Sequence, residues 1–200
     1  MIRRKDVIHR MVSESTATSE ARKAGRIEVQ RVDQPTDIEQ CQELFFEYGE
    51  WVAARLREVY GMVFDPAPLH ARFLEEEVPH LLGPRGGLYM AALDGVIAGV
   101  GALKPAGKQV AEVKRMYVRK SYRGAGLGRA LLSRVIEDAQ ALGYERLRLE
   151  TLEFMQEAHW LYETAGFRYV DRFEGESAIG GIAAISLFME LRLGSSNVAG

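Results

Sequence analysis

The sequence predicts one α/β domain with a mixed β-sheet in a chain of 200 residues. Two apolar runs flank the dipeptide Asp94-Gly95, which is typical of a two-residue hairpin turn between antiparallel strands. A third apolar run leads into a glycine-rich segment at residues 124–128, after which the apolar period changes from two to about 3.6 residues. This change marks the passage from a strand to a helix, so the second half of the chain combines both kinds of element.

The first half of the chain is expected to contain a short strand and two helices. The strand covers residues 27–32, where order should begin. Thr36 is followed by a glutamate three residues later, a capping-box pattern that predicts the start of the first helix. Apolar residues recur at helical spacing over residues 38–59, and two prolines open a second, shorter helix over residues 66–79.

The second half is expected to hold the rest of the sheet. The strand at residues 111–118 should pair with the strand at 96–103. The helix after the glycines has one apolar face and ends at Gly143. The expected elements are strands at residues 88–93, 96–103 and 111–118, a helix at 127–142, a strand at 146–150, a helix at 156–165, and strands at 167–170 and 184–191.

The ends of the chain and its charge limit the expected partners. Residues 1–25 are charged and rich in Ser and Thr, with no apolar stretch of a secretory signal. We therefore expect a flexible extension there, one domain at 26–193 and a frayed tail at 194–200. A net charge of -2 and the lack of an apolar run of bilayer length predict a cytoplasmic protein that binds neither nucleic acid nor membrane. No His, Cys and Asp residues have metal-ligand spacing, so we expect no metal.

Residues 118–129 hold the most informative pattern, in which a strand and a basic turn lead to glycines spaced two apart and then to a helix. The backbone N–H groups of such a loop suit a phosphate or pyrophosphate. The loop lacks the lysine of a P-loop. A dinucleotide loop is an alternative, because Glu150 lies at about the distance of a ribose-binding acid. Against it, Gly128 comes one residue early and a hairpin precedes the strand.

Two segments resemble the GNAT superfamily of acetyl-CoA-dependent N-acetyltransferases. Residues 111–118 followed by 123–128, Arg-Gly-Ala-Gly-Leu-Gly, are similar to its Arg/Gln-x-x-Gly-x-Gly/Ala loop. Residues 158–167, Ala-His-Trp-Leu-Tyr-Glu-Thr-Ala-Gly-Phe, are similar to its A-x-x-L-Y-E-x-x-G-F junction. The resemblance implies a mixed, mostly antiparallel sheet of about six to seven strands flanked by helices, with a splayed strand pair at the coenzyme site.

The resemblance implies acetyl-CoA as the donor. The strand before the loop would pair with the pantetheine arm through the backbone of Met116, Tyr117 and Val118. The loop would hold the pyrophosphate. Its residues are Arg123, Gly124, Ala125, Gly126, Leu127, Gly128 and Arg129.

Two side chains are candidates for proton transfer. Tyr162 matches the position from which many members protonate the coenzyme thiolate, and a packing role is the alternative. Glu112 is the candidate base, with a salt bridge as the alternative. Strand alternation places Glu112 on the face of Lys114, Met116 and Val118 unless a bulge intervenes.

The acceptor implied by the resemblance is a primary amine of a small molecule or of a protein. Carboxylates in the early helices and before the last strand either attract a cationic amine or form a solvated face. These residues are Glu47, Glu50, Glu58, Glu75, Glu76, Glu77, Asp171, Glu174 and Glu176. A non-catalytic module that binds acyl-CoA or a partner is the alternative to an enzyme, and a homodimer through the last strands stays open.

Overall fold

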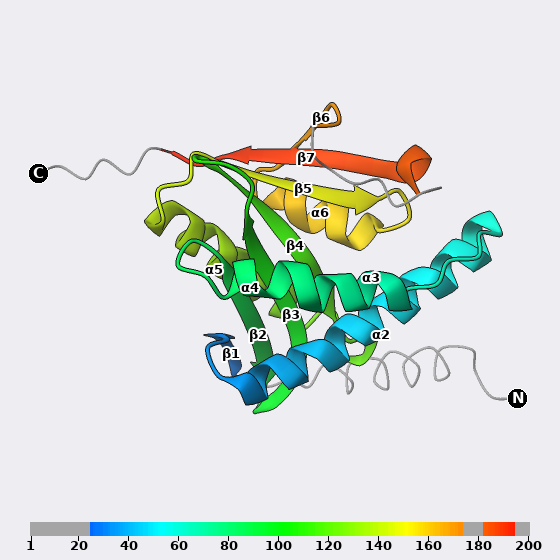
Figure 1. Ribbon diagram of the computed structural model, residues 1–200, viewed down its shortest axis with the longest axis horizontal. Coiled ribbons are helices and arrows are strands. Elements are labelled where there is room, and N and C mark those ends of the chain that lie inside the picture. Colours follow the sequence, from blue (N-terminus) through cyan, green and yellow to red (C-terminus); the bar gives the residue numbers. More distant parts are fainter. Residues whose placement is uncertain (1–24, 174–181, 195–200) are drawn as a thin grey trace, which may run out of the picture.

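The computed structural model describes residues 25–173 and 182–194, whose seven strands form one sheet in the order β1-β2-β3-β4-β5-β7-β6 (Figure 1). The strands are β1 (Ile27–Arg31), β2 (Gly87–Leu93), β3 (Val96–Pro105), β4 (Val110–Val118), β5 (Arg146–Leu152), β6 (Arg168–Val170) and β7 (Ser186–Arg192). The helices are α2 (Pro35–Tyr60), α3 (Ala67–Arg72), α4 (Val78–Leu81), α5 (Leu127–Ala141) and α6 (Gln156–Thr164). Single turns are η1 (Phe73–Glu77, π-helical), η2 (Lys120–Tyr122) and η3 (Ala183–Ile185).

The sheet is mixed and mostly antiparallel, as predicted. The pairs β1–β2, β2–β3 and β3–β4 are antiparallel, and so are β5–β7 and β7–β6. The one parallel pair joins β4 to β5, and α5 makes the crossover that a parallel pair requires. This pairing covers only Val110–Glu112 against Arg146–Arg148. Both strands continue beyond it without pairing to each other, so they splay apart as expected.

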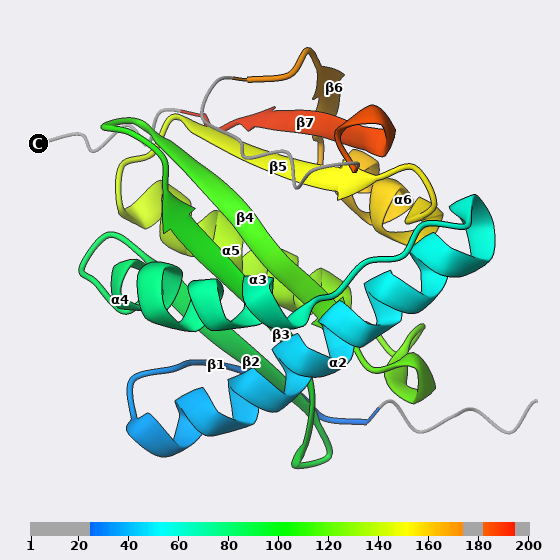
Figure 2. The ribbon, with the colours of Figure 1, turned by 45° about the vertical axis from the view of Figure 1, so that its right-hand side comes forward.

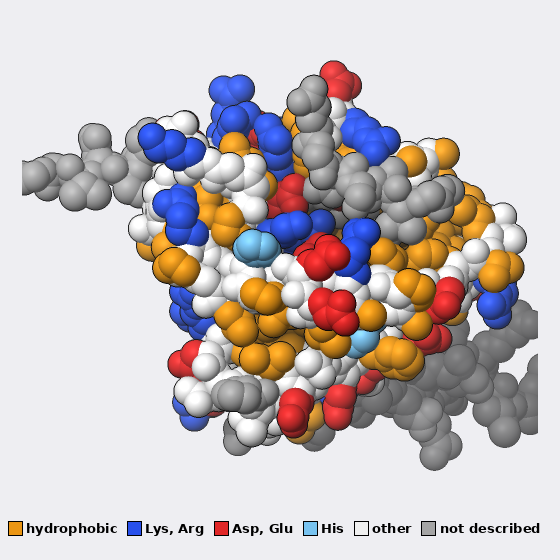
Figure 3. All heavy atoms as spheres, in the orientation of Figure 1, with side chains coloured by type: hydrophobic (Ala, Val, Ile, Leu, Met, Phe, Trp, Pro, Cys, Tyr) orange, Lys and Arg blue, Asp and Glu red, His pale blue; other side chains and the backbone are white. Residues whose placement is uncertain are grey.

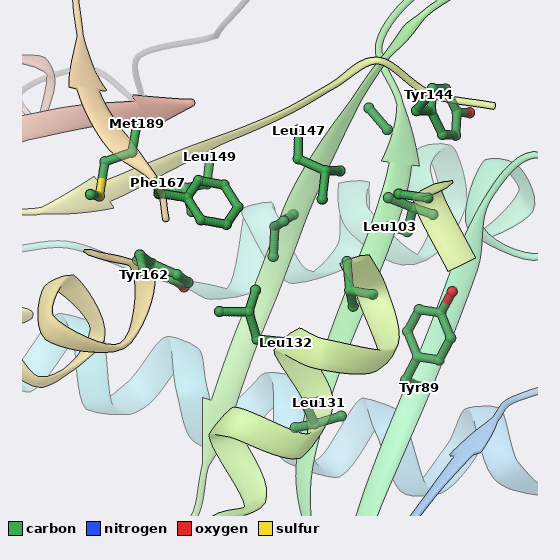
Figure 4. Close-up of a cluster of buried hydrophobic side chains, with 14 of the residues drawn as sticks. Tyr89, Leu103, Leu131, Leu132, Tyr144, Leu147, Leu149, Tyr162, Phe167 and Met189 are labelled. Carbon is green, nitrogen blue, oxygen red and sulfur yellow. The ribbon is translucent and has the colours of Figure 1, made fainter. Parts of the chain in front are cut away.

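Helices cover both faces of the sheet (Figures 1 and 2). On one face, α5 and α6 pack against β-strand side chains such as Leu103, Leu147 and Leu149 (Figure 4). On the other face, α2, η1 and α4 pack against Met90 and Val100. Because side chains alternate along a strand, β2, β3 and β4 each supply both cores. The α2–α4 layer and the α5–α6 layer thus lie on opposite sides of the β4–β5 splay.

The hairpin turn was predicted correctly, whereas the start of the first helix was not. Asp94 and Gly95 have φ values of 51° and 82°, the two positive values of a type I′ turn. Helix α2 begins at Pro35 with Gln34 as its N-cap, and no side chain caps it. The capping-box prediction at Thr36 is therefore wrong. The reason is that the fixed φ of proline favours the first helical position.

The second predicted helix, at residues 66–79, is present but longer and irregular. It runs from Ala67 through η1 to Leu81. Pro79 was expected to end it, yet this residue lies in the first turn of α4, where its missing N–H is tolerated. The predicted extension and tail lie almost entirely outside the described residues. Within residues 25–173 and 182–194, no helix combines the length and the apolar composition that a bilayer-spanning segment needs.

Candidate active site

A cavity of about 180 Å³ lies at the splay of β4 and β5. Its walls come from α2, from α3 and η1, from residues 113–116 of β4, from residues 150–152 of β5 and from α6. Because the two strands do not pair here, the cavity reaches from the α2–α4 side of the sheet to α6. A molecule in it would touch both layers of the fold.

A β-bulge in β4 shapes one wall of the cavity. Val100 pairs with Tyr117 and Ala102 pairs with Lys114, so Arg115 and Met116 together face a single residue of β3. Arg115 has a φ of 57°, as one residue of a bulge often does. The extra residue reverses the alternation, since Met116 packs in the α5–α6 core and Tyr117 in the α2–α4 core.

The bulge is the exception under which Met116 and Val118 do not share the face of Glu112. Regular alternation would place Met116 and Val118 on the face of Glu112 and Lys114. The structure instead packs Met116 and Val118 with Val113 in the α5–α6 core. Glu112 keeps Lys114 beside it, with Lys114 Nζ 3.7 Å from its carboxylate.

The glycine loop follows β4 and opens directly into α5. Gly124 and Gly126 have φ values of 78° and 101°, a region that favours glycine. Gly126 is the N-cap of α5, and no side chain bonds to the first turn. The amides of Leu127 and Gly128 have no intrahelical acceptor, because they begin the helix. The loop therefore has the donors and the helix end that suit an anionic group.

The arginines of the loop differ in their contacts. Arg129 is exposed beside the first turn of α5. Arg123 donates from Nε to the carbonyl of Val118 at 3.2 Å, lies 4.9 Å over the ring of Trp51, and has a terminal nitrogen 3.5 Å from Glu157. Arg123 thus connects the end of β4 to α2 and α6 beside the loop.

Tyr162 lines the cavity from α6. Its side chain is 6% exposed and lies beside Phe167, with ring centroids 5.8 Å apart (Figure 4). Burial raises the pKa of its phenol well above the usual range, and nearby Tyr48 raises it further. The phenol therefore keeps its proton at neutral and moderately alkaline pH.

Two carboxylates near the splay have different surroundings. Glu112 is buried and does not line the cavity. Glu150 does line it, and its carboxylate accepts a hydrogen bond of 2.6 Å from the hydroxyl of Ser186. Sequence reasoning considered Glu150 only as a ribose-binding acid. Its alternation with the buried Leu149 and Thr151 was the signal that it faces away from the α5–α6 core.

Tyr48 is a further cavity residue that the sequence did not indicate. It comes from α2. Burial raises the pKa of its phenol, the charge of Arg115 opposes this shift, and the charge of Glu150 adds to it. Tyr48, Arg115 and Glu150 all line the cavity. Tyr48 also packs beside Tyr117, with ring centroids 5.7 Å apart.

Most of the described carboxylates that were expected at the acceptor entrance do not line the cavity. Among the predicted carboxylates that the structure describes, Glu77 is the one that lines it. Glu77 lies 3.6 Å from Lys104 and 3.9 Å from Arg115, and Glu47 is held by Arg119. Figure 3 shows the corresponding mixture of basic and acidic side chains between α3 and β5. The remaining predicted positions, Glu174 and Glu176, lie outside the described residues.

Comparisons with known proteins agree on one family. A family model described as the acetyltransferase (GNAT) family matches residues 39–167. An uncharacterized N-acetyltransferase of Bacillus subtilis is 36% identical over 110 residues, which are 54% of this chain and 70% of that protein. An uncharacterized N-acetyltransferase of Schizosaccharomyces pombe is 30% identical over 157 residues, which are 76% of this chain and 88% of that protein.

Solved structures share the fold at low identity. An acetyltransferase from Streptococcus agalactiae has a TM-score of 0.64 at 20% identity, covering 84% of this chain and 98% of its own. The structure of yncA from Salmonella typhimurium with its cofactor acetyl-CoA has a TM-score of 0.56 at 17% identity, covering 87% of this chain and 96% of its own. The splayed strands, the glycine loop and the match over residues 39–167 lead to one conclusion. This chain is an N-acetyltransferase and belongs to the GNAT family.

Proposed function

We propose that this enzyme transfers the acetyl group of acetyl-CoA to the primary amine of an acceptor by direct attack on the thioester. The observation that carries the proposal is the cavity at the β4–β5 splay, which brings Tyr162 and Glu150 to one space. The glycine loop lies at the end of the same strand, β4. Donor binding and proton transfer thus have adjacent sites.

Acetyl-CoA would bind to the glycine loop and to the edge of β4 that no longer pairs with β5. The amides of residues 124–129 would bind the pyrophosphate, since glycine allows close backbone approach and the helix end favours negative charge. Beyond Glu112, β4 no longer pairs with β5. The backbone of Met116, Tyr117 and Val118 can therefore pair with the amide groups of the pantetheine arm, as a strand edge pairs with an added strand.

The reaction needs two proton transfers. The amine nitrogen attacks the thioester carbonyl carbon and loses a proton to a base, a C–N bond forms, and the C–S bond breaks. The departing thiolate takes its proton from Tyr162, whose raised pKa keeps the phenol protonated until then. The products are the acetylated amine and the free thiol of CoA.

We assign the base role to Glu150 in place of Glu112. Glu150 lines the cavity, whereas Glu112 is buried outside it with Lys114 Nζ at 3.7 Å. A base must come within hydrogen-bond reach of the amine, directly or through one water. Glu112 then has a structural role as an ion pair.

Exchanging each carboxylate for its amide separates the two assignments. We expect Glu150→Gln to lower kcat/KM at neutral pH by roughly 100-fold or more, because general-base catalysis typically contributes that much. The loss should shrink as pH rises towards about 10, where a free amine deprotonates in solution. Initial rates of thiol release across pH measure both effects.

Glu112→Gln is the matched control and should change the rate by less than about threefold, apart from any loss of folded protein. Melting curves of both variants report that loss. A larger rate defect in Glu112→Gln than in Glu150→Gln would return the base role to Glu112.

The proposed function itself is tested with acetyl-CoA and a panel of primary amines. Thiol release and mass spectrometry of the amine should show acetylation that depends on the enzyme. Tight binding of acetyl-CoA without turnover of any amine would instead support a module that only binds acyl-CoA.

A further inference from the structure

We propose that the acceptor is an α-amino acid with an apolar side chain, whose carboxylate binds Arg115 while its amine lies towards Glu150. This proposal rests on the proposed function, because it concerns the acceptor of the same reaction. It is carried by the charges and the apolar surfaces that the cavity brings together.

Arg115 is placed to bind a carboxylate. The bulge turns its side chain towards the α2–α4 side, where the guanidinium carbon lies 4.5 Å from the centroid of the Phe73 ring. Its terminal nitrogen is 3.9 Å from Glu77, which is longer than a hydrogen bond. In the described part of the chain, the buried Nε of Arg115 has no hydrogen-bond partner. The Oε2 atom of Glu77 also has no hydrogen-bond partner there, so the two groups leave each other unsatisfied. The Arg115 side chain is partly exposed and lines the cavity, so a ligand carboxylate that accepts from its terminal nitrogens gains affinity.

The wall of one cavity carries charges of both signs. Arg115 and Glu150 both line it, Arg115 from β4 and Glu150 from β5. An α-amino acid carries an ammonium and a carboxylate on the same carbon, so one molecule can meet both groups. A polyamine has no group for Arg115, and its extra cations would be repelled there.

The remaining charges of the cavity favour the same ligand. Arg72 and Lys114 also line it, and Glu77 is shared between Arg115 and Lys104. Burial and the nearby Arg115 lower the pKa of His70, so this ring is neutral at pH 7. Among the described residues, three cationic and two anionic side chains line the cavity, and Glu76 and Glu112 lie 3.8 Å from Arg72 and 3.7 Å from Lys114. A ligand that brings a carboxylate together with its ammonium fits this mixed wall.

Part of the wall is apolar. Phe45 and Val52 line the cavity from α2, Leu69 lines it from α3, and Phe64 lines it from the segment between the two helices. These side chains offer no hydrogen bonds to a polar substituent, and they gain by burying an apolar one. The amino acid that fits best therefore has an aromatic or branched aliphatic side chain.

Paired acceptors that differ only in the carboxylate test this inference. L-phenylalanine is compared with 2-phenylethylamine, and L-leucine with 3-methylbutylamine, at saturating acetyl-CoA. We expect kcat/KM to be roughly 10-fold to 100-fold higher for the amino acid of each pair, the range for a hydrogen bond to a charged group. Equal or faster acetylation of the amines without a carboxylate would overturn the proposal, as would preference for L-aspartate over L-phenylalanine.

Variants then locate the carboxylate site. Arg115→Gln should reduce the ratio of kcat/KM within each pair towards one, and Arg115→Lys should keep part of it. Arg85→Gln is the matched control, since Arg85 also lies 4.5 Å over an aromatic ring, that of Tyr144, and does not line the cavity. The ratio of kcat/KM within each acceptor pair should be the same for Arg85→Gln as for the unchanged enzyme. A ratio that survives in Arg115→Gln would remove Arg115 from the site.

Folding and the underlying function are checked separately. Melting curves and acetyl-CoA affinity show whether Arg115→Gln is intact, and an intact Arg115→Lys keeps the test valid if Arg115→Gln is not. Calorimetry of L-phenylalanine against the unchanged enzyme with CoA measures binding without turnover, and no binding there would overturn the inference. If all amines are acetylated without regard to the carboxylate, only this inference fails. If acetyl-CoA binds and no amine is acetylated, the proposed function fails.

Discussion

Tyr162→Phe is expected to lower kcat by roughly 100-fold to 10,000-fold, because positioned proton transfer contributes about that much. The variant loses only the hydroxyl, so the ring should still pack beside Phe167. Acetyl-CoA affinity should change less than about threefold, since the acid acts on the departing thiolate. Steady-state rates and a direct measurement of acetyl-CoA binding on the same preparation test both statements.

Tyr144→Phe is the matched control for this prediction. Tyr144 is also a buried tyrosine of the α5–α6 core, and its hydroxyl donates to the carbonyl of Arg85 at 2.8 Å, away from the cavity. It should lose stability and keep its rate per folded molecule. If Tyr162→Phe behaves in the same way, Tyr162 only packs.

The direction of the Tyr162 pKa shift adds a pH prediction. An acid works while it is protonated, and burial raises this pKa. The alkaline loss of activity due to this group should therefore lie above about pH 10, the usual value for a phenol. A Tyr162-dependent loss centred near neutral pH would contradict the role.

Gly124→Glu is expected to weaken acetyl-CoA binding by roughly 100-fold or more, because a carboxylate would face the pyrophosphate in a site built for an anion. A Cβ at Gly124 meets no atom within 4 Å, so the new side chain has room in the fold. Its φ of 78° makes any side chain strained, and this cost needs its own control. Binding is measured by titration with acetyl-CoA.

Gly143→Glu provides that control. Gly143 has a φ of 75° and also has no atom within 4 Å of a built Cβ, but it follows the far end of α5. Both variants carry the same strain and the same added charge. Equal losses of acetyl-CoA affinity in the two variants would remove the loop from the donor site.

Local patterns of the sequence predicted much of the fold and of the donor site. The Asp94-Gly95 turn, the paired strands on either side of it and the glycines before α5 depend on backbone preferences of neighbouring residues. Tyr162 was proposed because residues 158–167 resemble a GNAT junction that is continuous in sequence. These features need no knowledge of distant segments.

The assignment of the carboxylates needed the tertiary structure. The bulge at Arg115 exists because β4 pairs with β3 two residues against one, which is a relation between two strands. Glu150 reaches the cavity because β5 stops pairing with β4 after Arg148, and Glu112 does not line it. The sequence by itself determined the fold class, because strand period, turn residues and helix starts are local, and its resemblance to the GNAT superfamily supplied the donor-loop and Tyr162 predictions. Only the tertiary structure decided which charged side chains line the cavity, because that depends on the register and divergence of strands distant along the chain.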